Sequence, residues 1–113
     1  MTHQVNVLDY AKADYREIRK WVRMKFGETT WIEVEADSRK VLRQIGDMPL
    51  AGLVPPEIAE LGMTEYRQRL VGQTRVIYQI KEQVVFVHMF VDTSRDFSAM
   101  LNQRLLQPPL SRP

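Results

Sequence analysis

Along residues 9–47, apolar side chains recur every three or four positions, the spacing that places them on one face of an α-helix. The first helix shows this repeat at Ala11, Tyr15, Ile18, Val22 and Phe26, and the second at Trp31, Val34, Val41 and Ile45, with Ser38 on the same face. We expect Asp9 to cap the first helix and Thr29 or Thr30 the second, with Gly27 and Gly46 ending them. Two such helices joined by about three residues predict an antiparallel helical hairpin.

After residue 64 the period changes to two. Strands are predicted at 66–70, 75–80 and 84–91, with turns at Gly72 and at 81–83, which makes an antiparallel meander. The third of these segments is nearly all apolar, as is typical of a buried central strand. A further extended segment, 4–8, precedes the first helix.

Two shorter elements complete the pattern. The proline- and glycine-rich loop 46–63 holds one helical turn, 57–61, which Pro56 begins. A last helix is expected to begin at Thr93 or Ser94, with Asp96 in its first turn, an apolar face that includes Leu105, and an end at Pro108. The order β-α-α-β-β-β-α predicts an α+β fold: a helical hairpin packed on a twisted antiparallel sheet, in one domain over 1–107 with a loose tail at 108–113.

Composition narrows the class of protein. The 113 residues are 44% apolar and 27% charged, an ordinary globular balance. The absence of cysteine excludes disulfides and thiolate chemistry. No apolar run reaches the roughly 18 residues of a membrane span, and the first residues lack a signal peptide, so we expect a cytoplasmic protein without a membrane partner. The net charge is +2, and residues 64–113 carry seven Lys/Arg against four Asp/Glu, which suits an acidic partner.

The candidate chemistry is basic. Strand parity places Arg67 and Arg69 on one face of the sheet, and if the helices cover the other face, both project from an open surface. Arg75 begins the next strand, Arg95 follows the third strand, and His88 lies within it with the parity of Phe86 and Phe90. Guanidinium groups converging there would suit phosphate or carboxylate recognition.

Each candidate also has a structural interpretation. Arg67 and Arg69 fit a solvated strand face, Arg95 fits a pair with Asp96 at the helix start, and His88 fits a hydrogen-bonded core histidine. Trp21 and Trp31 lie on helices, where burial is the default. With two histidines and no cysteine there is no metal-ligand spacing, and no phosphate-binding or nucleophile motif appears, so we expect neither metal nor cofactor.

The segment YRQRLVGQTRVIYQI (66–80) resembles the signature of ParE/RelE toxins of bacterial type II toxin–antitoxin systems: a basic strand, a glycine turn and an Arg-Val-Ile-Tyr strand. The segment VVFVHMFVDTSRD (84–96) resembles their last strand, which runs into an Arg-Asp pair that opens a C-terminal helix. The upstream hairpin and the Pro49 to Gly52 loop agree in order and length. The likeness therefore covers most of the chain.

The superfamily divides by target. Its RelE-like branch implies a ribosome-dependent, metal-independent messenger ribonuclease, in which Arg75 and Arg95 match phosphate-binding residues and His88 or Arg69 would assist. Those nucleases carry a tyrosine in the last helix and several lysines on the sheet. Here residues 94–107 contain no tyrosine, and Lys81, in a turn, is the sheet region's one lysine.

The ending from Arg95-Asp96 through Leu101 to Arg104 resembles the ParE-like branch instead, whose members poison DNA gyrase. The resemblance thus favours a non-enzymatic gyrase inhibitor of the plasmid-stabilisation type, with Arg67, Arg69, Arg75 and Arg95 as target-binding residues.

The resemblance also implies partners. A cognate antitoxin with an acidic, flexible C-terminal segment would wrap the toxin by helix and strand addition. Operator DNA would be contacted only through the antitoxin, in a dimer or hetero-oligomer. The alternatives are the ribonuclease, with ribosome and mRNA as partners, and a degenerate toxin that acts only as a transcriptional co-repressor.

Overall fold

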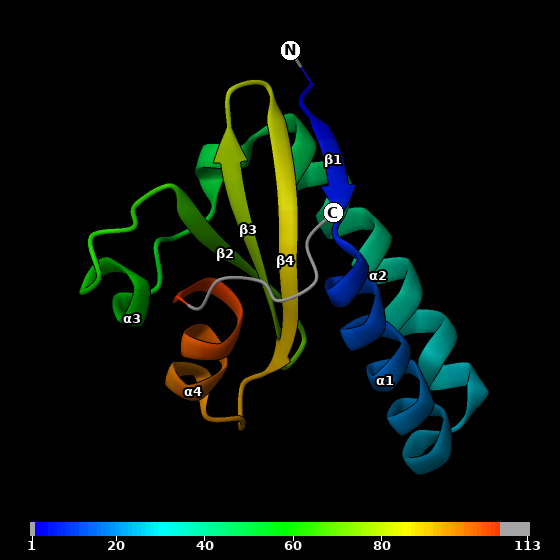
Figure 1. Cartoon of the computed structure of the whole chain (residues 1–113). Coiled ribbons are helices and arrows are strands. Elements are labelled where there is room, and N and C mark those ends of the chain that lie inside the picture. Colours follow the sequence, from blue (N-terminus) through cyan, green and yellow to red (C-terminus); the bar gives the residue numbers. More distant parts are fainter. Residues whose placement is uncertain (1, 107–113) are drawn as a thin grey trace.

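A four-stranded sheet in the order β1-β4-β3-β2 forms the centre of the protein, seen here in a computed structural model that describes residues 2–106, the last two by their backbone alone (Figure 1). The strands are β1 (Gln4–Val7), β2 (Tyr66–Val71), β3 (Thr74–Lys81) and β4 (Val84–Asp92). The predicted antiparallel meander β2-β3-β4 is confirmed. The sheet is mixed, however, because β1 pairs with β4 in parallel. Residue patterns predict which face a side chain occupies but not the direction of pairing, so the parallel edge could not be foreseen.

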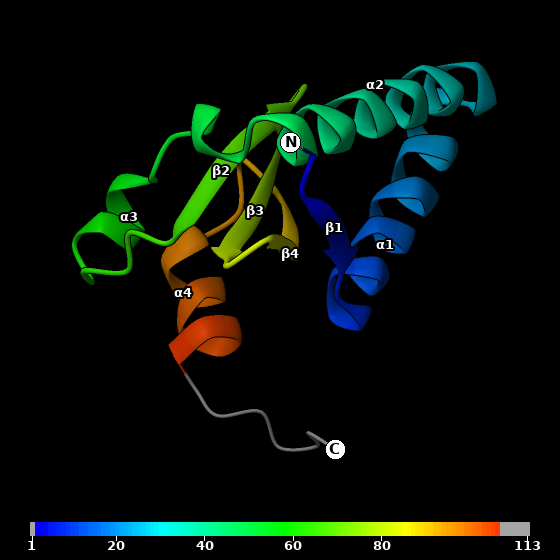
Figure 2. The same cartoon turned by 90° about the horizontal axis from the view of Figure 1, so that it is seen from above.

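The predicted helical hairpin is confirmed as α1 (Asp9–Phe26) and α2 (Glu28–Asp47), which lie side by side along the sheet (Figures 1 and 2). Gly27 alone separates the two helices, rather than about three residues. Its φ of 95° and ψ of 173° form a conformation that only glycine adopts readily, and this sharp turn lets α2 begin at the next residue.

The predicted N-caps are wrong, whereas Gly27 ends α1 as predicted and α2 continues one residue past Gly46. Leu8 is the N-cap residue of α1, and its amide donates to the Val87 carbonyl at 3.1 Å. Because this bond continues the pairing with β4, β1 runs directly into the helix and Asp9 lies inside the first turn. Gly27 takes the cap position of α2 that was expected of Thr29 or Thr30, and neither helix start has a side-chain cap.

Both faces of the sheet are covered. The hairpin buries one core on its face, whose members include Ala11, Ile45, Val76, Tyr78, Val85, Val87 and Phe90. The short helices α3 (Pro56–Ala59) and α4 (Phe97–Leu101) flank the opposite face, where a second core includes Ile58, Tyr66, Ile77, Met89, Val91, Phe97 and Leu101. The expectation of an open sheet face is therefore wrong.

A β-bulge interrupts β4. Residues 77 and 78 of β3 stand opposite residues 89 and 87 of β4, which makes His88 the extra residue. Val87 before the bulge and Phe90 after it both point into the hairpin core. Strict alternation predicts that the His88 and Phe90 side chains share one face of the sheet. They do not, because the inserted residue reverses the alternation.

The chain after β4 turns sharply into α4. Asp96 is the N-cap residue, and its carboxylate accepts from the Ala99 amide at 3.2 Å, a role predicted for Thr93 or Ser94. A π-helical turn, Asn102–Leu106, follows α4. The predicted packing of Leu105, the stop at Pro108 and the tail 108–113 lie outside the described side chains. Within residues 2–106, no helix combines the length and apolarity that crossing a bilayer requires.

The loop between α2 and β2 is attached to the sheet by Tyr78. The fully buried phenol donates to the Pro49 carbonyl at 2.6 Å, and Arg67 Nη1 donates to the Gly52 carbonyl at 2.8 Å. Burial raises the pKa of Tyr78, which keeps its hydroxyl protonated, although the positive charges of Arg67 and Arg69 act in the opposite direction. Gly52 has no room for a side chain, because a Cβ there would lie 2.2 Å from the Tyr78 hydroxyl.

This contact predicts that Gly52→Ala lowers the free energy of unfolding by about 1–3 kcal/mol through overpacking. Tyr78→Phe should reduce that penalty, because it removes the nearest atom. Gly62→Ala is the matched control: its φ of 74° makes alanine costly, but no atom lies within 4 Å of its Cβ. Urea unfolding of the single variants and of the double variants Gly52→Ala/Tyr78→Phe and Gly62→Ala/Tyr78→Phe gives two coupling energies. Equal coupling energies would contradict the inferred clash between a residue-52 side chain and the Tyr78 hydroxyl.

Candidate functional site

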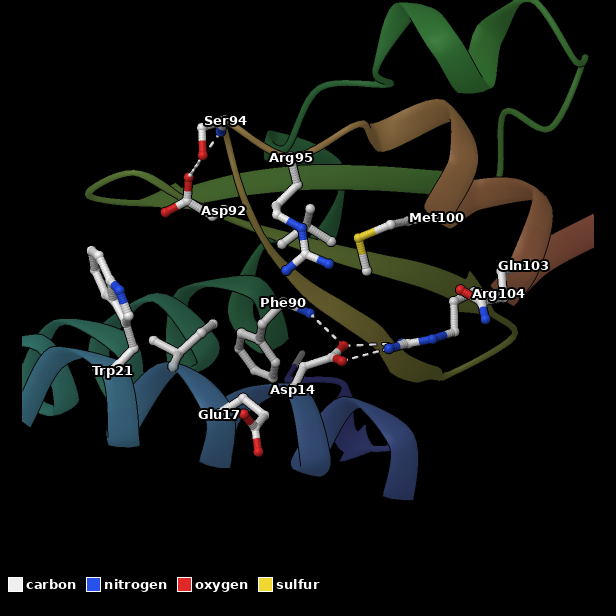
Figure 3. Close-up of a pocket in the computed structure, with 12 residues that line it drawn as sticks. Asp14, Glu17, Trp21, Phe90, Asp92, Ser94, Arg95, Met100, Gln103 and Arg104 are labelled. Carbon is white, nitrogen blue, oxygen red and sulfur yellow. Dashed lines mark hydrogen bonds and ion pairs between the residues drawn. The ribbon is translucent and has the colours of Figure 1, made fainter. Parts of the chain in front are cut away.

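β1 covers only half of one edge of β4. Its pairing with β4 ends at Val87, so no described strand lies beside residues 88–92 on that side. A groove of about 660 Å³ opens here between α1 and the α4 region (Figure 3). We call it the α1–α4 groove and define it by Asp14, Ile18, Trp21, Phe90, Arg95, Met100 and Arg104.

Side chains replace the missing strand at this edge. The Asp14 carboxylate accepts from the backbone amide of Phe90 at 3.2 Å, and Arg104 donates to the His88 carbonyl at 3.3 Å. Asp14 and Arg104 also pair with each other through two hydrogen bonds, of 2.5 and 3.0 Å. Their side chains are only 13% and 17% exposed, so this is a largely desolvated, bidentate ion pair that ties α1 to the π-helical turn.

The groove is lined by apolar side chains and by charged ones of both signs, and the Arg95 guanidinium is directed into it. Figure 3 shows the Arg95 guanidinium in the space between β4 and α1, with Met100 beside it and Phe90 below. Trp21 lies at the far end of α1 and is 45% exposed, which corrects the prediction that both tryptophans are buried; Trp31 is buried as expected. An extended segment with an acidic and an apolar side chain would match this lining.

A tight turn holds Arg95 at the mouth of the groove. The Asp92 carboxylate accepts from the Ser94 hydroxyl at 2.6 Å and from the Ser94 amide at 2.8 Å. These bonds, the hydroxyl's first, lower the pKa of Asp92, and the charge of Arg95 adds to the effect. The turn thus favours the ionised carboxylate.

Arg75 lies on the opposite face of the sheet from the hairpin. Its guanidinium stacks 4.5 Å from the Phe97 ring centroid, lies 3.6 Å from the Glu57 carboxylate and donates to Gln68 at 3.4 Å. Its side chain is 19% exposed. Arg75 therefore joins α3, β2 and α4 to β3, in an internal role.

Arg67 and Arg69 face the hairpin, not an open surface. Their cross-strand partners, Tyr78 and Val76, belong to the hairpin core. Arg69 donates to Gln44 of α2 at 2.7 Å, and Arg67 binds the loop carbonyls described above. Strand parity grouped the two arginines correctly but assigned the helices to the wrong face.

His88 is a core histidine, as its structural interpretation held. It is 9% exposed, with the Tyr10 hydroxyl 3.3 Å from Nδ1, Gln79 Oε1 2.9 Å from Nε2, and the Tyr66 ring edge-on at 5.2 Å between centroids. Both ring nitrogens thus lie within hydrogen-bonding distance of neighbouring side chains.

The four arginines consequently fall into three places, and they do not form one basic site. The groove residues Asp14, Arg104 and Met100 were missed. A carboxylate at position 14, beside the apolar stripe of α1, was the one available signal. Among residues 2–106, no group of three or more His, Asp or Glu side chains could hold a metal ion.

The comparisons with known proteins agree with this architecture. The family profile described as "ParE toxin of type II toxin-antitoxin system, parDE" matches residues 5–97. Among curated proteins, none matches the sequence significantly. A chain of the chromosomal ParDE toxin–antitoxin system of P. aeruginosa superposes with a TM-score of 0.65 at 11% identity, over 80% of this chain and 96% of that one.

A second solved structure, an E. coli RelE toxin mutant in the free state, gives a TM-score of 0.56 at 19% identity, over 88% of this chain and 93% of that one. These two likenesses show that the fold of this chain is shared with both structures.

For the ion pair, we expect Asp14→Ala to lower the free energy of unfolding by about 3 kcal/mol, because it leaves Arg104 charged and largely buried without its partner. In an Arg104→Met background the same substitution should cost clearly less. Urea denaturation of the wild type, the two single variants and the double variant gives the coupling energy. Additive effects of the two substitutions would show that the pair contributes nothing as a unit.

For the turn, Ser94→Ala should raise the pKa of Asp92 toward its ordinary value, because the hydroxyl donor is lost. A lowered native pKa contributes stability above the unfolded-state pKa that is lost as pH falls through the native value, so the variant should lose this contribution at higher pH than the wild type. NMR titration of the Asp92 carboxyl carbon measures the shift. Thr93→Ala, a neighbouring exposed site, should leave the titration unchanged.

Proposed function

The chain belongs to the ParE toxin family of type II toxin–antitoxin systems, and we propose that it arrests growth by binding DNA gyrase rather than by cutting RNA. The observation that carries this proposal is the dispersal of the four candidate arginines. Arg75 is held by Glu57 and Phe97, while Arg67 and Arg69 are held by the loop and α2. A metal-independent nuclease needs several basic groups around one phosphate, and the four candidate arginines do not meet at one such place.

The α1–α4 groove supports a binding function. It offers a strand edge, apolar walls and Arg95, which is the one of the four predicted arginines that is exposed and directed into a cavity. We therefore assign target contact to the surface around Arg95. Arg67, Arg69 and Arg75 position the loop and helices that frame the sheet.

The same groove suits a cognate antitoxin. An extended acidic segment could lie along residues 88–92 of β4 if it displaced Asp14 and Arg104 from the Phe90 amide and the His88 carbonyl, with a carboxylate on Arg95 and an apolar side chain against Trp21 and Met100. Occupation of the groove would mask the Arg95 surface, so neutralisation follows from direct competition for one site.

A supercoiling assay tests the proposed target. The purified toxin should inhibit supercoiling of relaxed plasmid by gyrase, and Arg95→Ala should weaken inhibition by about tenfold, the loss of one charge-assisted contact. Arg39→Ala is the matched control, since Arg39 is 71% exposed on α2 and pairs with Glu35 on the same helix; it should inhibit like the wild type.

Undiminished supercoiling at saturating toxin would reject gyrase as the target. Codon-phased cleavage of translated messages during expression, lost in Arg75→Ala, would establish the ribonuclease alternative instead. Normal growth on expression without an antitoxin would point to a co-repressor without toxicity.

A further inference from the structure

The outer face of α1 carries a run of five basic residues. They are Lys12, Arg16, Arg19, Lys20 and Arg23, spaced so that the side chains follow one another along the helix. We call this set the basic stripe. All but Arg19, which is half-buried, are exposed.

Helix geometry places the basic stripe on the side of α1 that points away from the core. At 100° per residue, the five positions fall within an arc of about 100°, whose centre lies about 120° around the helix from the buried residues Ala11 and Val22. The single acidic residue within that arc is Asp9, at the start of the helix. α1 lies at the outside of the molecule, with α2 and the sheet on its inner side (Figure 2).

The charge of the stripe is only partly compensated within the chain, by Glu28 and by Glu17, which lines the same hollow as Arg16, Arg19, Lys20 and Arg23. Arg23 pairs with Glu28 at 2.7 Å, whereas the other four make no ion pair with any described acidic side chain. Lys12, Arg16 and Lys20 follow at intervals of four, as do Arg19 and Arg23, and like charges at this spacing repel each other. An arrangement that disfavours the isolated helix is explained if an anionic partner neutralises it.

From this arrangement we propose that α1 binds the phosphate backbone of duplex DNA through the basic stripe. Cations about 6 Å apart along a straight helix form a linear array about 16 Å long. Duplex DNA presents one of the densest fixed arrays of negative charge, about one per 1.7 Å of its axis. The stripe contains no aromatic residue on which unstacked bases could lie, which argues against a single strand.

An acidic protein segment fits the stripe less well. Peptide docking draws most of its free energy from apolar and aromatic anchors. The hollow that holds Arg16, Arg19, Lys20 and Arg23 contains one exposed apolar side chain, Met24, whereas Trp21, Phe90 and Met100 line the α1–α4 groove on another side of α1. Phosphate contacts are sequence-independent, so this binding differs from operator recognition through an antitoxin. It is also independent of the proposed action on gyrase.

Fluorescence anisotropy with a labelled 20-base-pair duplex tests the proposal on the full-length toxin. We expect binding whose affinity falls steeply with salt. The double variant Arg16→Gln/Lys20→Gln should weaken it about tenfold and reduce the salt slope by about two, the number of phosphate contacts removed. The matched control Arg39→Gln/Lys40→Gln removes the same charge from exposed positions on α2 and should change affinity by no more than about twofold.

Three results would overturn the proposal: no duplex binding at low salt, equal weakening by the two double variants, or displacement of the duplex by poly-glutamate at equal charge concentration. Thermal unfolding of the stripe variant checks its fold. Relief of like-charge repulsion should leave its melting temperature unchanged or higher, so weaker binding cannot be ascribed to unfolding.

Discussion

β4 has two faces and two edges to cover, and the chain covers all of them but part of one edge. The hairpin packs on one face, α3 and α4 flank the other, and β3 pairs along the full length of one edge. β1, with four residues against nine in β4, ends at Val87. At the remaining edge, Asp14 and Arg104 bind the Phe90 amide and the His88 carbonyl, so an ion pair between two distant parts of the chain lines the candidate site.

The elements of the fold could be predicted because apolar periodicity is a local property of the chain. Both long helices, all four strands and the buried central strand follow from it. The β-bulge at His88 could not be predicted, since an extra residue in a strand leaves no trace in a sequence as apolar as 84–91. The coverage of both faces was missed for a related reason: α3 and α4 are short, and their contribution depends on contacts such as Arg75 with Glu57 and Phe97 rather than on a periodic pattern.

The arginines illustrate why a charged residue type predicts a function poorly. Arg67, Arg69, Arg75 and Arg95 are alike in sequence, but three of them contribute hydrogen bonds or ring contacts to the packing of loops and helices. The guanidinium group serves this purpose well because its planar fork satisfies several acceptors at once and its stem packs against apolar neighbours. Only the surroundings distinguish such a residue from one that faces a partner, and Arg95 is distinguished by the groove in front of it.

α1 connects the two surfaces on which the proposals depend. One side contributes Asp14, Ile18 and Trp21 to the groove, and the other carries the basic stripe. The buried residues Ala11 and Val22 lie between these two sides. A rigid helix shared in this way fixes the angle between the two surfaces, because its inner face is packed on β4. A partner in the groove and a DNA duplex along the stripe would therefore lie on different sides of the same helix.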